Sequence, residues 1–394
     1  MGTPPLPSIA TGWLGDDLRE RQQRQEEHQR EHQQERGAKD VVVMDGSMGH
    51  LCILRGVPDD RQLWSARGLV EEQYHEIVIA AHMDYIRAGC CTITTNNYAV
   101  QPNYYRRAFA NDWEARIRKD TELAARLAVK ARSLCSTQGF DVKILGCLPP
   151  ICETHRPDLT ASFIRAEGEE ACRKFYKSVG EALVQGGVDA FLAESMNSWE
   201  EAMLVIEATK DLGKPLLVSM EGALRNESLQ PQPQLAGEVA KKVLRAKTAE
   251  GAHIVALGFN CAPPEEILKA LEAIESCGVG EDLRRAGVTL AAYANCNDRR
   301  AVHDVAGFNV LEMKSRQICL REDLKGLGYV AWCKRFVSAG AKYCGGCCGS
   351  SPEMIGELVK ALAAESIIAK LLPEEQEVAA PLLVDGDISR TTRA

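Results

Sequence analysis

Short runs of β-branched and other apolar residues alternate with long amphipathic stretches through most of this sequence. An apolar run followed by a charged segment of helical length is typical of a repeated strand–helix unit. Eight such units favour a single-domain α/β fold, a closed (β/α)8 TIM barrel, over an open doubly wound sheet, and 394 residues suffice for one such barrel with extended tails. The predicted strands are residues 41–44, 92–95, 142–145, 190–193, 216–219, 254–257, 288–293 and 342–344.

The two ends of the chain differ in composition from the middle. Residues 17–36 consist almost entirely of Asp, Glu, Arg, Gln and His, with Leu18 the only aliphatic side chain. Because such a stretch has no apolar face to bury, residues 1–38 are predicted to be an extension, either disordered or a solvated helix. A partner-binding arm is the alternative. The barrel then occupies residues 39–365, and residues 366–394 form a C-terminal tail.

The overall composition narrows the class of function. A net charge of -8 argues against a nucleic-acid-binding surface, so small-molecule partners are expected. No apolar run is long enough to cross a membrane, and the first residues lack a secretory signal, which together predict no membrane partner and a cytoplasmic location. Fifteen cysteines, an odd number in a long chain, indicate reduced thiols rather than a disulfide framework.

Polar residues and cysteines collect where the predicted strands end. In a barrel all of these ends face one mouth, and that mouth holds the active site. Each position, taken singly, is also compatible with an ordinary cap or turn. The residues concerned are Asp45-Gly46, Thr95-Asn96-Asn97-Tyr98, Glu194, Asn260-Cys261, Asn295 and Gly345-Gly346-Cys347-Cys348-Gly349.

The adjacent Cys347 and Cys348 are the most informative of these residues. Gly346 and Gly349 flank them, so little side-chain bulk hinders both sulfur atoms from turning toward one point. A catalytic zinc site takes three ligands from the protein and leaves a fourth position open, and Cys261 would complete the three. These cysteines therefore predict a zinc site.

Two other cysteine pairs serve as comparisons. Cys90-Cys91 has no flanking glycine and is predicted to be buried in the core. Cys344 and Cys347 have the C-x-x-C spacing of a redox dithiol, but the next helix signal starts later, at Ser351, whereas such a dithiol opens a helix directly.

At these residues the sequence resembles the homocysteine S-methyltransferase family, which includes betaine- and S-methylmethionine-dependent enzymes. The resemblance implies a (β/α)8 barrel that uses zinc to transfer a methyl group from a small sulfonium or ammonium donor to homocysteine, giving methionine. The matching stretches are Asp45-Gly46-Ser47-Met48-Gly49 with Arg55-Gly56, Leu63-Trp64-Ser65-Ala66, Thr94-Thr95-Asn96-Asn97-Tyr98, Gly258-Phe259-Asn260-Cys261 and Gly345-Gly346-Cys347-Cys348-Gly349.

The resemblance also implies a role for each matching residue. Cys261, Cys347 and Cys348 would be the catalytic zinc ligands. Asp45 and Gly46 would contact homocysteine, Glu194 would bind its amino group, and Asn260 would orient the site. A helix cap beside Ser195 is the alternative role for Glu194. Trp64 and Tyr98 could offer aromatic faces to a cationic donor, with plain packing as the alternative.

The identity of the methyl donor is the least determined part of this interpretation. Leu63-Trp64-Ser65-Ala66 is closer to S-methylmethionine users than to betaine users, which favours S-methylmethionine. Asn97, and the segment from Gly146 to Glu153, depart from the commoner family pattern near the expected donor entrance. Selenocysteine or another thiol as acceptor, a zinc-binding barrel without activity, and a homo-oligomeric assembly all remain compatible with the sequence.

Overall fold

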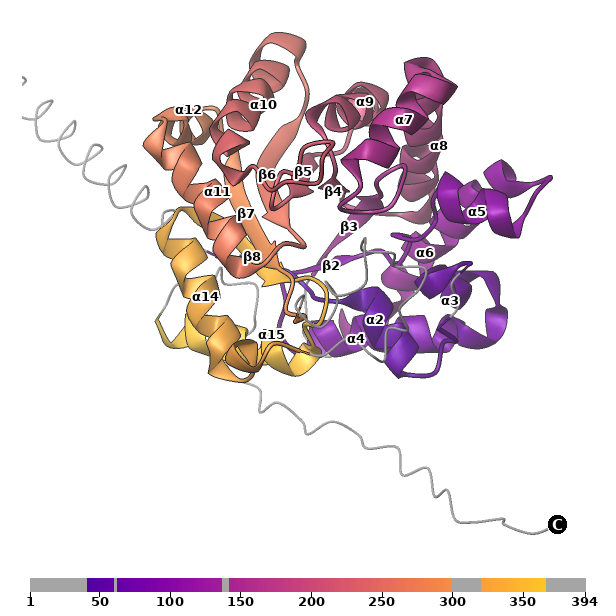
Figure 1. Cartoon of the computed structure of the whole chain (residues 1–394). Coiled ribbons are helices and arrows are strands. Elements are labelled where there is room, and N and C mark those ends of the chain that lie inside the picture. Colours follow the sequence, from indigo (N-terminus) through magenta and orange to yellow (C-terminus); the bar gives the residue numbers. More distant parts are fainter. Residues whose placement is uncertain (1–40, 60–61, 137–141, 299–319, 366–394) are drawn as a thin grey trace, which may run out of the picture.

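The computed structural model describes residues 41–59, 62–136, 142–298 and 320–365, and every structural statement below concerns these residues. Eight parallel strands form one sheet in the order β1-β8-β7-β6-β5-β4-β3-β2 (Figure 1). The predicted extension, residues 1–38, and the predicted tail, residues 366–394, lie outside the described residues. The strands are β1 Val42–Val43, β2 Thr92–Thr94, β3 Lys143–Leu148, β4 Ala190–Met196, β5 Leu216–Glu221, β6 Ile254–Asn260, β7 Thr289–Ala294 and β8 Ala341–Gly346.

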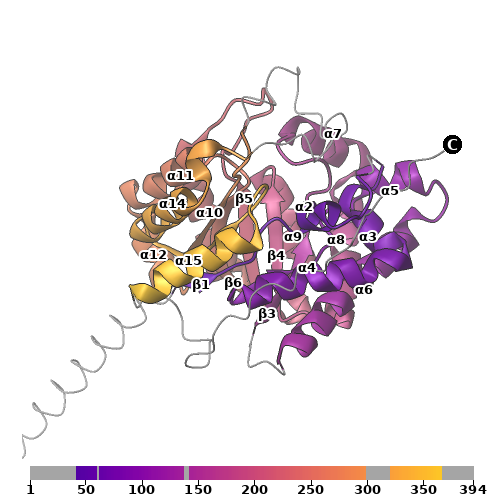
Figure 2. The same ribbon diagram turned by 90° about the horizontal axis from the view of Figure 1, so that it is seen from below.

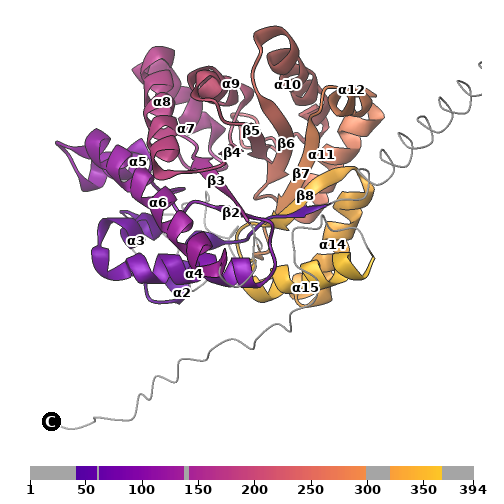
Figure 3. The ribbon, with the colours of Figure 1, turned by 180° about the vertical axis from the view of Figure 1, so that it is seen from behind.

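The sheet closes on itself between β1 and β2. Met44, just after β1, forms a parallel bridge with Thr92, and the Asp45 amide donates to the Thr92 carbonyl at 3.1 Å. On its other side β1 pairs with β8, where Val42 is in register with Tyr343. The first and last strands therefore lie side by side in the sheet (Figure 3), and the predicted closed barrel is confirmed.

Helices surround the sheet, and the last helix, α15, contacts α4 near the start of the barrel (Figure 2). The layer of helices therefore closes around the sheet. Short helices α2, α3, α5 and α7 lie in the connections above the strand ends. The helices are α2 Met48–Leu54, α3 Arg67–Val70, α4 His75–Arg87, α5 Pro102–Ala108, α6 Trp113–Ser136, α7 Pro157–Glu167, α8 Glu169–Gly186, α9 Trp199–Thr209, α10 Ala236–Glu250, α11 Pro264–Ser276, α12 Val279–Arg285, α14 Leu327–Ser338 and α15 Pro352–Ala364.

Helix α8 shows how the sequence pattern makes this layer. Its buried side chains include Cys172, Tyr176, Val179 and Leu183, which recur at intervals of three and four residues and so share one face. The helix ends before Gly187, whose φ of 94° lies in the left-handed region that glycine adopts at low cost. The apolar face packs against β3 and the neighbouring helices α6 and α9.

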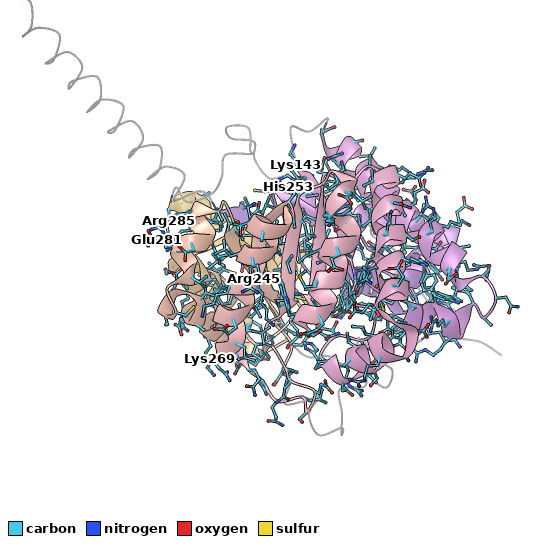
Figure 4. The ribbon with its side chains drawn as sticks, turned by 90° about the horizontal axis from the view of Figure 1, so that it is seen from above. Lys143, Arg245, His253, Lys269, Glu281 and Arg285 are labelled. Atoms are coloured by element: carbon cyan, nitrogen blue, oxygen red, sulfur yellow. The ribbon has the colours of Figure 1, made fainter. Side chains whose placement is uncertain are left out.

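Two apolar clusters hold the barrel together. The larger lies between the sheet and the helices, and the smaller comprises Met44, Leu145, Ala190, Leu192, Leu217, Ala256 and Tyr293, which alternate inward along the strands. Because side chains fill the interior, no pore runs through the barrel and ligands are confined to one end. Lys143 begins β3 and His253 directly precedes β6, so both lie at the end of the barrel opposite to the carboxyl ends of the strands (Figure 4).

Several strands run two or three residues beyond their predicted ends. β3 extends to Leu148, β4 to Met196 and β6 to Asn260, so Glu194 and Asn260 lie inside strands rather than after them. The apolar runs stop earlier because the last residues of each strand point toward the polar mouth while their backbones still pair with neighbouring strands. Among the described residues, no helix is long and apolar enough to span a membrane.

Candidate active site

The carboxyl ends of the strands surround a cavity of about 160 Å³. Of the nine predicted site residues, eight line it, and the ninth, Asn260, lies directly behind it. Three carboxyl groups line this cavity, and none of the described residues that line it is Lys or Arg. The cavity is therefore suited to a cationic ligand. The predicted lining residues are Asp45, Gly46, Trp64, Tyr98, Glu194, Cys261, Cys347 and Cys348.

Three cysteine sulfur atoms meet at one point of the cavity wall. The Sγ atoms of Cys261, Cys347 and Cys348 all lie within 4.8 Å of one another, and Cys261 Sγ is 3.5 Å from Cys348 Sγ. Tetrahedral coordination with Zn–S bonds of about 2.3 Å places two sulfur ligands about 3.8 Å apart, so the cluster fits zinc. Asn295 Nδ2 points at Cys261 Sγ from 3.8 Å and adds a donor to the sulfur. Thiolates this close repel each other, and a cation is needed to hold all three deprotonated.

Asn260 supports the cluster from within β6. Its Nδ2 atom donates to Ser195 Oγ at 2.6 Å and lies 3.9 Å from Cys347 Sγ. Its Oδ1 atom accepts from Ser219 Oγ at 2.8 Å. The side chain is completely buried, so this network fixes the amide rather than leaving it to solvent.

Two carboxyl groups lie beside the cysteines, that of the buried Asp45 and that of the partly buried Glu194. Asp45 accepts hydrogen bonds from the backbone N–H of Thr94 at 2.7 Å and from its hydroxyl at 3.1 Å, and burial raises the pKa of Asp45 to about 8. Glu194 accepts from Cys147 Sγ at 3.1 Å, and burial raises its pKa to about 7. The N-cap of the following helix, α9, is Ser198, so Glu194 does not cap that helix. A bound cation would favour the ionised form of both carboxyl groups.

Gly46 has a packing role in addition to any contact with a ligand. A Cβ atom at this position would meet Ser350 Oγ at 2.6 Å, and one at Gly346 would meet the same atom at 2.1 Å. The two glycines thus let the loop after β1 and the end of β8 approach each other closely. This approach brings Asp45 and Cys347 into one cavity.

Trp64 and Tyr98 form one side of the cavity. Their rings make an edge-on contact with centroids 6.3 Å apart and an interplanar angle of 81°. Both side chains line the cavity, so their surfaces are available to a ligand as well as to each other. The two roles considered for them, packing and ligand contact, are therefore compatible.

Sequence analysis missed a histidine–carboxylate pair, His155 and Glu221. His155 Nδ1 lies 2.8 Å from Glu221 Oε1, both side chains are buried, and His155 also hydrogen-bonds Cys261. Glu221 ends β5, so the rule that functional groups follow strand ends would have identified it had the strand been extended past Ser219. His155 lies in the loop between β3 and α7, where no periodic pattern marks it.

Comparisons with known proteins agree with the geometry. The sequence profile of the family described as homocysteine S-methyltransferase matches residues 42–362. Homocysteine S-methyltransferase of Escherichia coli is 26% identical over 328 residues, covering 81% of this chain and 94% of that protein. An S-methylmethionine–homocysteine S-methyltransferase of Pongo abelii is 26% identical over 335 residues, covering 83% of this chain and 79% of that protein.

A solved structure is also similar in fold. The metallated form of the homocysteine methyltransferase MmuM from Escherichia coli superposes with a TM-score of 0.59 at 22% identity, covering 82% of this chain and 96% of that one. The profile match extends over nearly the whole barrel, from β1 to α15. This chain therefore belongs to the homocysteine S-methyltransferase family.

Proposed function

We propose that this protein transfers a methyl group from a small sulfonium or ammonium donor, with S-methylmethionine favoured, to the sulfur of homocysteine, giving methionine in a zinc-dependent reaction. The observation that carries the proposal is the cluster of three cysteine sulfur atoms in the wall of a cavity with no lining Lys or Arg among the described residues. Family membership and the name of the Pongo abelii relative support the acceptor and the favoured donor.

Cys261, Cys347 and Cys348 would hold the zinc ion. When bound, zinc would take the homocysteine sulfur as a fourth ligand and keep it deprotonated near neutral pH. Asn260 and Asn295 would keep the cysteine side chains in place through their N–H groups.

Glu194 and Asp45 would bind the rest of homocysteine. Asp45 is buried, Glu194 is partly buried, and the two carboxyl groups are electrostatically coupled, so each is best ionised when a positive charge lies nearby. The ammonium group of an amino acid supplies that charge. Gly46 lines the same cavity, where its main chain would contact homocysteine.

Methyl transfer between the two sulfur atoms balances without another reactant. A lone pair of the homocysteine thiolate forms a bond to the methyl carbon, and the bond between that carbon and the donor sulfur breaks. The donor sulfur keeps the electron pair and becomes a neutral thioether. Because one negative and one positive charge disappear together, an enclosed cavity of low polarity favours the reaction over water.

The test is a donor screen with the purified zinc-loaded protein. Homocysteine would be incubated with S-methylmethionine, betaine, S-adenosylmethionine or dimethylsulfoniopropionate, and methionine would be measured by mass spectrometry. We expect methionine from S-methylmethionine, loss of activity on chelation and recovery with added zinc. A protein that binds zinc yet forms no methionine from any donor is a barrel without this activity. Faster methylation of selenocysteine would make it a methyltransferase of different specificity.

A further inference from the structure

We propose that Glu153 and Gln101 bind the protonated amino group of the methyl donor, which selects sulfonium compounds that are amino acids. This inference rests on the proposed methyl-transfer function and deepens it. It assigns the choice of donor to two residues that are separate from the cysteines and from the proposed homocysteine-binding carboxylates. Both residues line the active-site cavity.

Glu153 is a buried carboxylate that forms no ion pair with a described residue, although Arg156 lies close enough for the two charges to interact. It is 5% exposed and lies in the loop between β3 and α7. In the described part of the chain, its carboxylate accepts one hydrogen bond, from Asn103 Nδ2 at 3.1 Å. The nearest arginine in sequence, Arg156, forms two hydrogen bonds with Asp158 instead, at 2.8 and 2.7 Å. Because an unpaired buried carboxylate is unfavourable, a cation entering from the cavity would be stabilised there.

Gln101 presents an acceptor that no donor among the described residues satisfies. Its Nε2 atom donates to the backbone carbonyl of Tyr98 at 2.9 Å, and only the nitrogen can make that bond, so the orientation of the amide is determined. The Oε1 atom is buried, and no donor among the described residues reaches it. Thr154 Oγ1, beside Glu153, is a second buried cavity atom without a partner within the described residues. An ammonium group has three N–H donors, and these three side chains supply acceptors for them.

The segment from Tyr98 to Asn103 holds these acceptors together. Gln101 Nε2 donates to the Tyr98 carbonyl, and Asn103, in the first turn of α5, donates to Glu153. Tyr98 also contributes its ring to the aromatic side of the same cavity. A donor with its sulfonium against that ring would carry its amino group toward Gln101 and Glu153.

The proposal distinguishes between methyl donors by whether they carry a protonated amine. S-Methylmethionine, betaine and dimethylsulfoniopropionate all carry a carboxylate and a cationic methyl centre. Only S-methylmethionine also carries a protonated amine with N–H donors. Acceptors without donors would therefore favour S-methylmethionine over the other two compounds.

The decisive experiment compares two sulfonium donors in one variant. Glu153→Gln removes the charge and keeps the shape of the side chain. We expect it to lower kcat/KM for S-methylmethionine by about 10- to 150-fold, mainly through KM, because a charge-assisted hydrogen bond is lost. For dimethylsulfoniopropionate, which has no amine, kcat/KM should change by less than about 2-fold. The affinity for S-methylmethionine, measured by calorimetry without homocysteine, should fall in parallel. If dimethylsulfoniopropionate is not turned over, this affinity alone tests the role of Glu153.

Glu227→Gln is the matched control because the Glu227 side chain is 67% exposed, and its ion pair with Arg165 is long at 3.9 Å. This variant should leave kcat/KM for both donors unchanged. If Glu153→Gln does not fold, Gln101→Met replaces it, since it removes the buried acceptor at similar volume.

Two results would overturn the inference. One is an unchanged KM and affinity for S-methylmethionine in the variant. The other is an equal loss of kcat/KM with both donors, which indicates a structural role for Glu153. Either result leaves the proposed function intact, provided that the unmodified protein forms methionine. Absence of methionine with every donor overturns the proposed function and the inference together.

Discussion

Cys261 has a strained backbone, with a φ of 54° in the left-handed region that residues other than glycine seldom adopt. Such strain persists where the surrounding structure compensates for it, and it is concentrated at functional sites. Here the compensation includes the backbone hydrogen bond from the Cys261 amide to the Tyr293 carbonyl at 3.2 Å. The strained turn aims the sulfur from β6 toward Cys347 and Cys348 at the end of β8.

The cysteine cluster predicts a metal stoichiometry that can be measured directly. The protein should bind about one zinc ion, and Ser at position 261, 347 or 348 should each reduce zinc content strongly, because a hydroxyl is a poor ligand beside thiolates. Atomic absorption of purified, dialysed protein checks this. Cys90→Ala and Cys91→Ala are the controls, since both side chains are buried and neither belongs to the cluster. Full zinc content in all three Ser variants would falsify the site.

Glu194 predicts a selective effect on the acceptor. Glu194→Gln should raise the homocysteine KM by about 10- to 150-fold, because a charge-assisted hydrogen bond contributes about 1.5 to 3 kcal/mol. The KM for the donor should change much less. Steady-state kinetics with each substrate varied in turn measure both constants. Glu200→Gln, an exposed position on the next helix, should alter neither. A homocysteine KM within about 2-fold of the unmodified protein would remove Glu194 from the site.

At the scale of elements, α9 holds the loop that carries Glu153 and His155. Glu201, in the first turn of α9, is completely buried. Its carboxylate accepts hydrogen bonds from the backbone N–H groups of Ile151 at 2.7 Å and Asn197 at 2.9 Å, and from the Tyr176 hydroxyl at 3.0 Å. One side chain thus fixes the start of the β3–α7 loop to the end of β4.

Glu201→Ala should therefore destabilise the protein and disturb donor binding. Each buried donor left without a partner costs about 1 to 3 kcal/mol, so the free energy of unfolding should fall by more than about 2 kcal/mol. The donor KM should rise with it. Ser198→Ala is the matched control at the start of the same helix: it removes the N-cap oxygen that accepts a hydrogen bond from the Glu201 amide, and it should cost about 1 kcal/mol without affecting the donor KM. Denaturant unfolding and kinetics on both variants separate the effects, and equal donor KM values would contradict this role for the loop.

At the scale of the whole molecule, we propose that residues 39–365 form the functional unit. The described barrel closes through β1 and β8, and the family profile matches residues 42–362. A fragment of residues 39–365 should keep the activity of the full chain, with a Tm lower by no more than a few degrees, because residues 17–36 offer no apolar face. Calorimetry and kinetics on both proteins check this. A larger fall in Tm would show that an end of the chain packs on the barrel.

The sequence by itself determined the barrel and the sulfur cluster. Eight apolar runs separated by amphipathic segments specify the strand–helix repeat. A buried strand needs a continuous apolar run and a surface helix needs one apolar face, and both patterns can be read locally in the sequence. Cys261, Cys347 and Cys348 could be identified because each follows an apolar run and two are flanked by glycines. The strand ends were predicted too short, since polar residues there break the apolar pattern while backbone pairing continues.

Only the tertiary structure decided which side chains meet in the cavity. Cys147 meets Glu194, His155 meets Glu221 and Asn103 meets Glu153 across 47, 66 and 50 residues of sequence. Each contact depends on the register of neighbouring strands and on the loops that join them, and no local pattern encodes either. That no described donor reaches the side-chain oxygen of Gln101 is visible only once the surrounding donors have positions, because a missing hydrogen bond is a property of the whole arrangement.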